Sequence, residues 1–380
     1  MSRDYLGKGK DESVLQETAK SWGVDPKAEM YKLPAMYVGA YAERDAQLTL
    51  ELWQELKKEI LHQDIEAIFA METKLFPVLV DMRYLGVRVD QDKAAIEKKR
   101  MVEDEKRLLG GIYAETGIDV QLFAARSIAR IFDKLGLPYD RTEKTKAPSF
   151  TKNFLANHPH KIVQAIAKAR EINKAHTTFI DTILKYSGKG RIHAEINQLR
   201  GDGGGTVTGR FSMNNPNLQQ IPARNKDLGP RIRSLFLPEE GCKWGCFDYS
   251  QQEPRLVVHF AAKTEPICFD NSVSDIVEKF NNNDVDFHQT VADMANISRT
   301  QAKTINLGLF YGMGKAKLQA ELGLATKQEA EDLFNQYHNN VPFVRDLMNA
   351  TSRHAQNSGS IGTLLGRRCR FNKWEPNSFG

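Results

Sequence analysis

The most informative stretch of the sequence for the fold is Ser298-Arg-Thr-Gln-Ala-Lys-Thr-Ile-Asn-Leu-Gly-Leu-Phe-Tyr-Gly312. Arg299, Lys303, Leu307 and Tyr311 recur every four residues, so on a helix they share one face. Along that face two cations are followed by an apolar residue and then by an aromatic ring. This order suits a nucleoside triphosphate, with its phosphates against the cations and its base against the other two side chains.

The ends of this helix can also be read from the sequence. Ser298 and Gln301 fit a capping box, which predicts that the helix begins just after Ser298. Gly312 and Gly314 fit its end. Gly308 lies inside it at a cost of about 1 kcal/mol relative to alanine, which suggests that something approaches the backbone there. The competing interpretation is an ordinary amphipathic helix whose Leu and Tyr pack in a core.

A second segment, Phe247-Asp-Tyr-Ser-Gln-Gln-Glu-Pro-Arg255, carries a carboxylate. Strand-like runs at Ile232–Leu237 and Lys243–Phe247 precede it, and a helix is expected from about Gln251. The apolar run into Asp248 predicts a buried strand that ends at a site. In isolation, an Asp at a strand end is more often a cap or a turn residue.

Together these segments resemble the fingers helix and the first catalytic motif of family A DNA polymerases, the DNA polymerase I type. The resemblance implies that Arg299 and Lys303 bind triphosphate oxygens and that Tyr311 guards the templating position. It further implies Mg²⁺ as the cofactor, held by the Asp248 carboxylate and the Tyr249 carbonyl for two-metal phosphoryl transfer. Glu253 matches the steric gate against a ribose 2′-hydroxyl.

Leu307 stands where this family more often has an aromatic residue. We therefore expect slower intrinsic insertion with fidelity retained.

Supporting segments extend the resemblance over nearly the whole chain. Thr208-Gly-Arg-Phe-Ser212 and Asn215-Pro-Asn-Leu-Gln-Gln-Ile-Pro222 resemble the segment at the primer–template minor groove, where Arg210 and Gln219 would donate to base or sugar acceptors. Asp286-Phe-His288 resembles the segment whose histidine meets the triphosphate. The expected substrates are therefore primer–template DNA and a dNTP.

Scattered positions in the thumb-like region also match the family. They would contact backbone phosphates or hold the palm together: Arg170, Glu171, Lys174, Asn197 and Gln198. For Arg231 and Arg233 a phosphate contact and a structural role both remain open.

Both ends of the chain lack motifs that the family has. Tyr41 and Asp45 match the third motif of a 3′→5′ exonuclease, but no D-x-E precedes them. No histidine is followed by aspartate, so the H-D-E motif with the second metal carboxylate is missing, although Gly362–Arg368 resembles the segment before it. We expect the central piece of a phage-like polymerase that is split or truncated. One partner polypeptide would supply the exonuclease front and another the H-D-E motif.

Length, net charge, cysteine content and hydropathy limit the possible classes of protein. The 380 residues suffice for two or three domains, and 53 Lys+Arg against 48 Asp+Glu give a net charge of +5. Cys242 and Cys246 lack a second pair, which argues against zinc. No apolar run of 18 residues and no signal peptide is found, so the expectation is a cytoplasmic protein, in a host cell if phage-encoded, without a membrane role.

The expected fold class is α+β with a right-hand polymerase architecture. The expected domains are a helical exonuclease remnant (1–80), a thumb with the start of the palm (81–200), a palm with the first catalytic motif (201–262), fingers (263–350) and a truncated return to the palm (351–380). One alternative is a catalytically inactive DNA-binding or scaffold remnant. Another, a single-subunit RNA polymerase, is disfavoured by Glu253, by the Thr-Gly-Arg segment and by the exonuclease motif.

Overall fold

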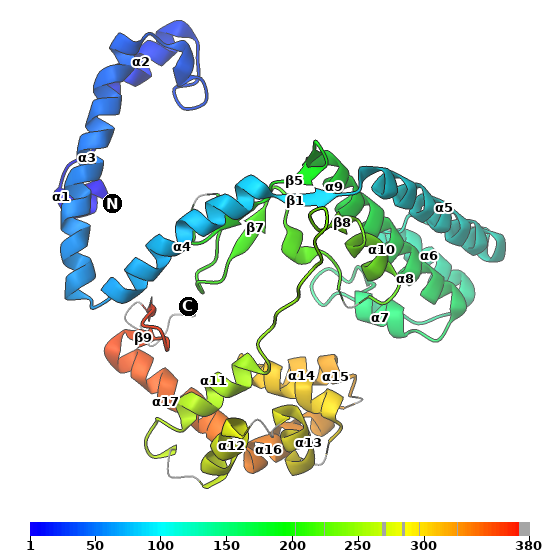
Figure 1. Cartoon of the computed structure of the whole chain (residues 1–380). Helices are drawn as coiled ribbons and strands as arrows, with labels where there is room; N and C mark the ends of the chain where they lie inside the picture. Colours follow the sequence, from blue (N-terminus) through cyan, green and yellow to red (C-terminus); the bar gives the residue numbers. More distant parts are fainter. Residues whose placement is uncertain are drawn as a thin grey trace. The chain divides into compact units, whose positions relative to one another are not determined.

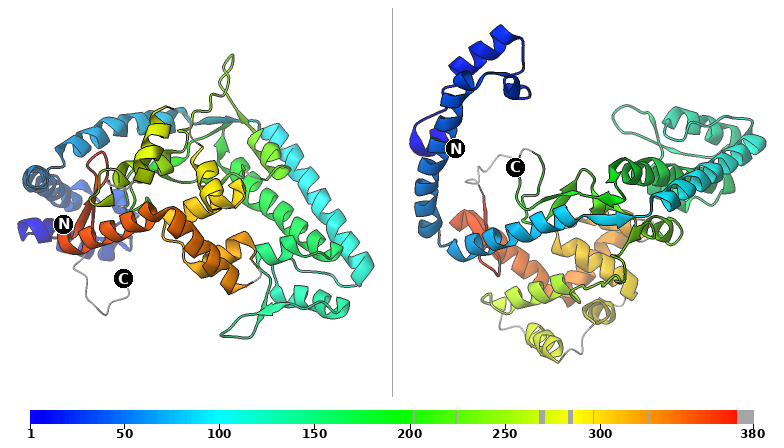
Figure 2. Two further views of the ribbon diagram at one scale, coloured as in Figure 1. Left: turned by 90° about the horizontal axis from the view of Figure 1, so that it is seen from below. Right: turned by 45° about the horizontal axis from the view of Figure 1, so that its top comes forward.

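The structure is a computed structural model that describes residues 1–201, 203–223, 225–267, 271–282, 286–295, 297–324 and 326–371 (Figures 1 and 2). The chain forms two compact units. Unit 1 comprises Met1–Phe69 with Cys246–Gly380, and unit 2 comprises Ala70–Gly245. Helices combine with small antiparallel sheets, so the predicted α+β class is confirmed. Within the described residues, no helix is both long and apolar enough to cross a membrane.

Unit 2 contains a four-stranded sheet in the order β4-β5-β1-β8. The strands are β1 (Val87–Val89), β4 (Ser187–Gly188), β5 (Arg191–Ile192) and β8 (Phe236–Leu237). All pairs are antiparallel, with Val87 opposite Ile192 and Val89 opposite Phe236.

The strand expected over Ile232–Leu237 is mostly wrong. Only its last two residues are in β8, and Leu228–Arg233 form the helix α10. Leu228 and Ile232 are four residues apart, so on a helix both reach the core of this unit, where they are 4% and 0% exposed. That burial favours the helix over an extended chain.

The rest of unit 2 is mainly helical. Its helices are α4 (Glu66–Leu85, which begins in unit 1), α5 (Gln91–Thr116), α6 (Ala125–Leu135), α7 (Lys152–Asn157), α8 (Lys161–Lys174), a π-helix (Ala175–Ile180), α9 (Asp181–Tyr186) and a 3₁₀ turn (Leu218–Gln220). Two hairpins pair β2 (Asp140–Arg141) with β3 (Pro148–Ser149) and β6 (Glu195–Asn197) with β7 (Ser212–Asn214). Helix α5 packs along α8 (Figure 2).

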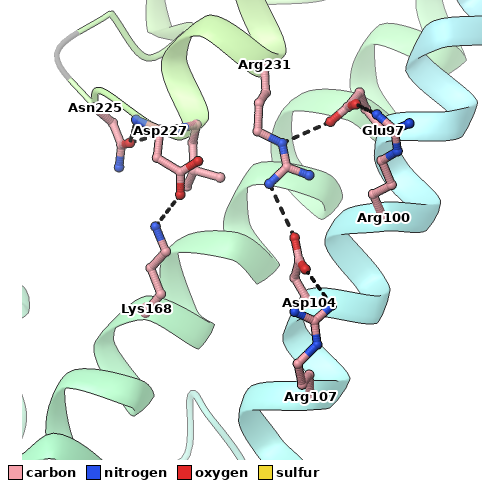
Figure 3. A network of polar contacts seen from close by, with 9 residues as sticks. Glu97, Arg100, Asp104, Arg107, Lys168, Asn225, Asp227 and Arg231 are labelled. Atoms are coloured by element: carbon pink, nitrogen blue, oxygen red, sulfur yellow. Dashed lines mark hydrogen bonds and ion pairs between the residues drawn. The ribbon is translucent and has the colours of Figure 1, made fainter.

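An ion-pair network ties α10 to α5 (Figure 3). Arg231 Nε lies 2.9 Å from Glu97 Oε2, and Arg231 Nη1 lies 3.4 Å from Asp104 Oδ2. Burial acts to lower the pKa of Arg231, but these carboxylates outweigh it and raise the pKa. Lys168 pairs with Asp227 beside the network. The open question for Arg231 is thereby answered in favour of a structural role.

The N-terminal part of unit 1 is helical, as expected. It contains α1 (Ser2–Leu6), α2 (Ser13–Trp22), a 3₁₀ turn (Met30–Lys32) and α3 (Ala35–His62). Leu15, Ala19 and Leu33 form a small buried cluster.

The C-terminal part of unit 1 contains seven helices among its described residues. They are α11 (Gln252–Ala261), α12 (Asn271–Asn281), α13 (Phe287–Ala295), α14 (Arg299–Phe310), α15 (Lys315–Leu322), α16 (Lys327–Asn340) and α17 (Pro342–Ser358), followed by the hairpin β9 (Ser360–Gly362) and β10 (Arg368–Arg370). Apolar side chains from these helices share one core, in which Phe287, Ile305 and Phe343 are fully buried. The helix expected from about Gln251 is confirmed as α11.

Candidate nucleotide-binding and catalytic site

Helix α14 begins and ends where the sequence indicated. Ser298 Oγ accepts from the backbone N–H of Gln301 at 3.2 Å, and Gln301 Oε1 accepts from the backbone N–H of Ser298 at 3.0 Å. The predicted capping box is therefore present. The last helical residue is Phe310, and Gly312 follows in the left-handed region with a φ of 73°.

The glycine inside α14 also has a physical reason. A Cβ at Gly308 would lie 2.2 Å from Met313 Cε and 3.3 Å from Met313 Cβ. The Met313 side chain is thus the group that approaches the backbone, which confirms the expectation. Met313 is 7% exposed and belongs to the helical core.

The two faces of α14 have different surroundings. The face buried in the core consists of Ala302, Ile305, Asn306 and Leu309. The other face carries Arg299, Lys303, Leu307 and Tyr311, and we call it the stripe. Arg299 and Lys303 are exposed, Leu307 is half-buried and Tyr311 is 65% exposed. Tyr311 does not pack in the core, so the alternative of a core-packed aromatic is wrong for Tyr311, whereas Leu307 is half-buried.

Asp286 connects α13 to α14. Its Oδ1 accepts from the backbone N–H groups of His288 and Gln289, at 3.1 and 3.2 Å. Its Oδ2 lies 2.6 Å from Arg299 Nη2 and 2.7 Å from Arg299 Nε. Burial alone would raise the pKa of Asp286, but Arg299 and the backbone donors lower it. Arg299 is thus held in place by a carboxylate.

His288 lies against α14 and is 7% exposed. Its Nδ1 is 3.1 Å from Asn306 Nδ2, and Asn306 Oδ1 accepts from the Tyr337 hydroxyl at 2.9 Å. Burial lowers the pKa of His288; Asp286 opposes this effect, while Lys303 and Arg299 add to it. The sequence analysis missed Asn306 and Tyr337. The available signal was an asparagine on the apolar face of α14.

The start of α11 lies beside this cluster. The Tyr311 hydroxyl donates to Glu253 Oε1, so the proposed template guard and the proposed sugar gate are in direct contact. Gln251 has a φ of 54°, which side chains other than glycine rarely adopt. Its Oε1 accepts from the backbone N–H of Phe287 at 2.7 Å, which links the beginnings of α11 and α13.

The strand expected before Asp248 is absent. Residues 238–251 form only turns and coil, and each residue from 241 to 250 is exposed. Phe247 and Tyr249 are 97% and 79% exposed. An isolated strand leaves its backbone N–H and C=O groups unpaired, and no strand in the described part of the chain pairs with this segment. The predicted buried strand is therefore wrong, while the position of Asp248 just before α11 is as expected.

The donors for a metal ion are present only in part. Asp248 offers a carboxylate and Tyr249 a carbonyl, which are the oxygen ligands that Mg²⁺ takes. Across the described residues, no three His, Cys, Asp or Glu side chains lie close enough together to hold a metal. Asp248 and Tyr249 fit one side of a magnesium site and need further ligands.

Arg210 and Gln219 belong to unit 2. Gln219 follows the β6–β7 hairpin in the 3₁₀ turn and donates to the Phe211 carbonyl at 3.1 Å. Arg210 is exposed, and its carbonyl accepts from the Thr206 hydroxyl at 2.7 Å. The structure thus places both in one loop region of this unit.

Other matched positions in unit 2 have structural contacts. Arg170 donates to the carbonyls of Leu122 and Phe150, at 2.5 and 3.1 Å. Asn197 donates to Asn214 Oδ1 across the β6–β7 hairpin at 2.5 Å. These contacts hold the unit together, which was one of the two roles expected for such residues.

Tyr41 and Asp45 share a face of α3, as their spacing predicted. Lys10 Nζ lies 2.7 Å from Asp45 Oδ1 and 3.4 Å from the Tyr41 hydroxyl. The lysine neutralises the carboxylate on this face.

Comparison with known proteins adds to this geometry. The model of "DNA polymerase family A" matches residues 92–379. A DNA-directed DNA polymerase of Pseudomonas phage M6 is 35% identical over 96% of this chain and 62% of its own length. The thermostable DNA polymerase I of Thermus filiformis is 32% identical over 87% of this chain and 40% of its own length. The chain belongs to DNA polymerase family A.

A solved structure shows the same fold. It is the POL domain of Pol1 from M. smegmatis in complex with DNA primer-template and dNTP, with a TM-score of 0.71 and 23% identity. The match covers 97% of this chain and 63% of the other. This chain therefore spans less than two thirds of the phage relative and of this structural neighbour.

Proposed function

We propose that this chain is the nucleotide-binding part of a template-directed DNA polymerase, which adds dNTPs to a primer 3′-end. One observation carries the proposal: the solvent-facing stripe of α14, with Arg299 and Lys303 along it and Tyr311 at its end. The opposite face of the helix is fixed in a core, so the stripe is preorganised for a ligand. Arg299 and Lys303 take the triphosphate oxygens, and His288 donates a further hydrogen bond.

The remaining residues have roles toward the primer and the incoming sugar. Glu253 excludes a 2′-hydroxyl, and its bond to Tyr311 couples the sugar gate to the template guard. Arg210 and Gln219 contact the minor groove of the primer–template. Asp248 and the Tyr249 carbonyl hold Mg²⁺, which when bound neutralises charge on the attacking and leaving oxygens.

In this proposal, a segment that carries an H-D-E motif supplies the second metal carboxylate. The sequence has no H-D-E motif, and the Asp248 segment has no pairing strand among the described residues. Helix α4 also exposes large apolar side chains within unit 2, among them Phe76 at 60% and Met82 at 52%. Such a surface favours association.

In domain terms, we assign the exonuclease remnant to 1–80, the thumb with the start of the palm to 81–200, the palm to 201–262, the fingers to 263–350 and the return to the palm to 351–380. The shared core of α11–α17 supports the fingers assignment, because it unites most of that range.

Primer extension tests the function. The purified chain is mixed with primed single-strand template, dNTPs and Mg²⁺, with and without a polypeptide that carries H-D-E. Extension that depends on the second polypeptide and on Asp248 is the expected result. Extension by the chain alone would contradict the split, and ribonucleotide incorporation would favour an RNA polymerase.

The second candidate is an inactive DNA-binding remnant. Asp248 is exposed, and among the described residues it belongs to no group of three His, Cys, Asp or Glu side chains that could hold a metal, which favours this candidate. Primer–template binding without extension in the presence of the complementing polypeptide would support this alternative. The interpretation as a split polymerase has its own test. Light scattering that shows a monodisperse chain with no affinity for the H-D-E polypeptide would count against that interpretation.

A further inference from the structure

The hydrogen bonds behind His288 form a directed chain that the proposed function does not use. Asn306 and Tyr337 are both 0% exposed, and His288 is 7% exposed. We propose that Asn306 and Tyr337 are a positioning pair that fixes His288 with its hydrogen on Nε2, so that Nε2 donates to a triphosphate oxygen. The triphosphate part rests on the proposed function, whereas the tautomer part rests on the structure alone.

The direction of the chain is set by the orientation of the Asn306 amide, whose oxygen faces the buried Tyr337 hydroxyl. Burial raises the pKa of Tyr337 well above that of an ordinary tyrosine, so its hydroxyl keeps its hydrogen. It donates to Asn306 Oδ1 at 2.9 Å. The amide NH₂ of Asn306 is then directed at His288 Nδ1, 3.1 Å away. A nitrogen that faces a donor must accept, so the imidazole hydrogen lies on Nε2.

The same arrangement opposes protonation of His288. An imidazolium carries N–H on both nitrogens, so its Nδ1–H would face the Asn306 NH₂. Turning the amide over would relieve that clash but would remove the acceptor of the Tyr337 hydroxyl. Among the charged groups near the ring, Asp286 favours protonation, while Arg299 and Lys303 oppose it. His288 is therefore a neutral donor with a fixed direction.

Fixing the tautomer has a consequence for binding. A free imidazole exchanges its hydrogen between two nitrogens and must be selected in one form when a ligand arrives. A donor that is already oriented avoids that selection, as in other preorganised sites.

Nitrogen-15 NMR of the imidazole rings tests the tautomer directly in the full chain. His288 is assigned by its loss in His288→Gln, and buried His176 of unit 2, which is bonded to Glu105, is the internal control. In the unsubstituted chain we expect a protonated Nε2 and an unprotonated Nδ1. Asn306→Asp replaces the donor with an acceptor, so the hydrogen should appear on Nδ1 and the pKa of His288 should rise.

Tyr337→Phe provides the second variant, because it removes only the hydroxyl. The amide is then free to turn over, and we expect His288 to show both tautomers while His176 is unchanged. If Asn306→Asp does not fold, this variant carries the test. A His288 that has its hydrogen on Nδ1 in the unsubstituted chain, or that keeps one tautomer in both variants, would overturn the proposal.

Titration with dATP and Mg²⁺ tests the proposed contact between His288 Nε2 and the triphosphate. His288→Gln and Asn306→Asp should each weaken dATP binding by about tenfold, the value of a hydrogen bond to a charged group. A confirmed Nε2 tautomer with unchanged dATP affinity in His288→Gln would overturn the triphosphate contact. That result would contradict the proposed role of His288 and leave the fixed tautomer standing.

Discussion

The α13–α14 region and the segment 241–250 carry the two halves of the proposed chemistry, but they hold their side chains differently. Arg299 is bonded to Asp286 just before α13, His288 is bonded to Asn306 on α14, and α14 is anchored by a buried face. Asp248 lies in coil in which every residue is exposed. A helix satisfies its own backbone, whereas a strand needs a neighbour. The nucleotide side, α13–α14, is therefore formed locally, and we propose that the metal side, residues 241–250, forms only with a pairing strand.

The largest expected effect is on the metal side. In the complemented enzyme, Asp248→Ala should reduce primer extension by more than about a hundredfold, since even outer-shell partners of a metal cost 10- to 100-fold. dATP affinity should remain unchanged. Glu240→Ala, an exposed carboxylate nearby, is the matched control. Equal activity of the two variants would remove Asp248 from the chemistry.

The next effect is on the stability of the nucleotide side. Asn306→Leu leaves the Tyr337 hydroxyl and His288 Nδ1 without the amide that each of them contacts, which should cost about 3 kcal/mol of unfolding free energy. Chemical denaturation of the lone chain measures it. Thr300→Ala on the exposed face of α14 is the control. If both variants unfold at the same denaturant concentration, the buried network does not stabilise this region.

The next prediction concerns Leu307 on the stripe of α14. Leu307→Phe supplies the aromatic ring that the family resemblance implies at this position, and we expect insertion to become severalfold faster with a changed uptake of dideoxynucleotides. Single-nucleotide kinetics of the complemented enzyme measures both. No change in either quantity would refute the role assigned to Leu307.

A smaller effect concerns pH. The pKa of Asp286 is lowered in the folded chain, so its contribution to stability is present above the unfolded pKa of about 3.9 and is lost as the pH falls through the folded value. Asp286 and Arg299 are 39% and 52% exposed, so the solvent-screened effect is small. Denaturation between pH 6 and pH 2 should show a weaker acid dependence in Asp286→Asn than in Asp332→Asn. Identical profiles would contradict this assignment.

The smallest expected effect is at Phe247. Its side chain is 97% exposed, so Phe247→Ser should change the stability of the lone chain by less than about 0.5 kcal/mol. It should weaken association with the complementing polypeptide. A large loss of stability in the lone chain would show that the segment is already packed.

The sequence predicted what local patterns determine. Ser298 and Gln301 specify the start of α14, and Gly308 marks the approach of Met313. It missed Asn306 and Tyr337, because they are 31 residues apart and only the fold brings them together. It wrongly predicted a strand at Ile232, because the burial of Leu228 and Ile232 on one helix face depends on the core around them. It wrongly predicted a strand before Asp248, because an apolar run does not reveal whether a partner strand is present. The contact between Tyr311 and Glu253 was likewise not readable from spacing.

Hydrogen exchange measured by mass spectrometry on the lone chain tests the central contrast most directly. We predict strong protection of peptides covering Arg299–Phe310 and immediate exchange over residues 241–250, with protection of the latter gained when the H-D-E polypeptide is added. Protection of residues 241–250 in the lone chain, or rapid exchange of α14, would contradict the account.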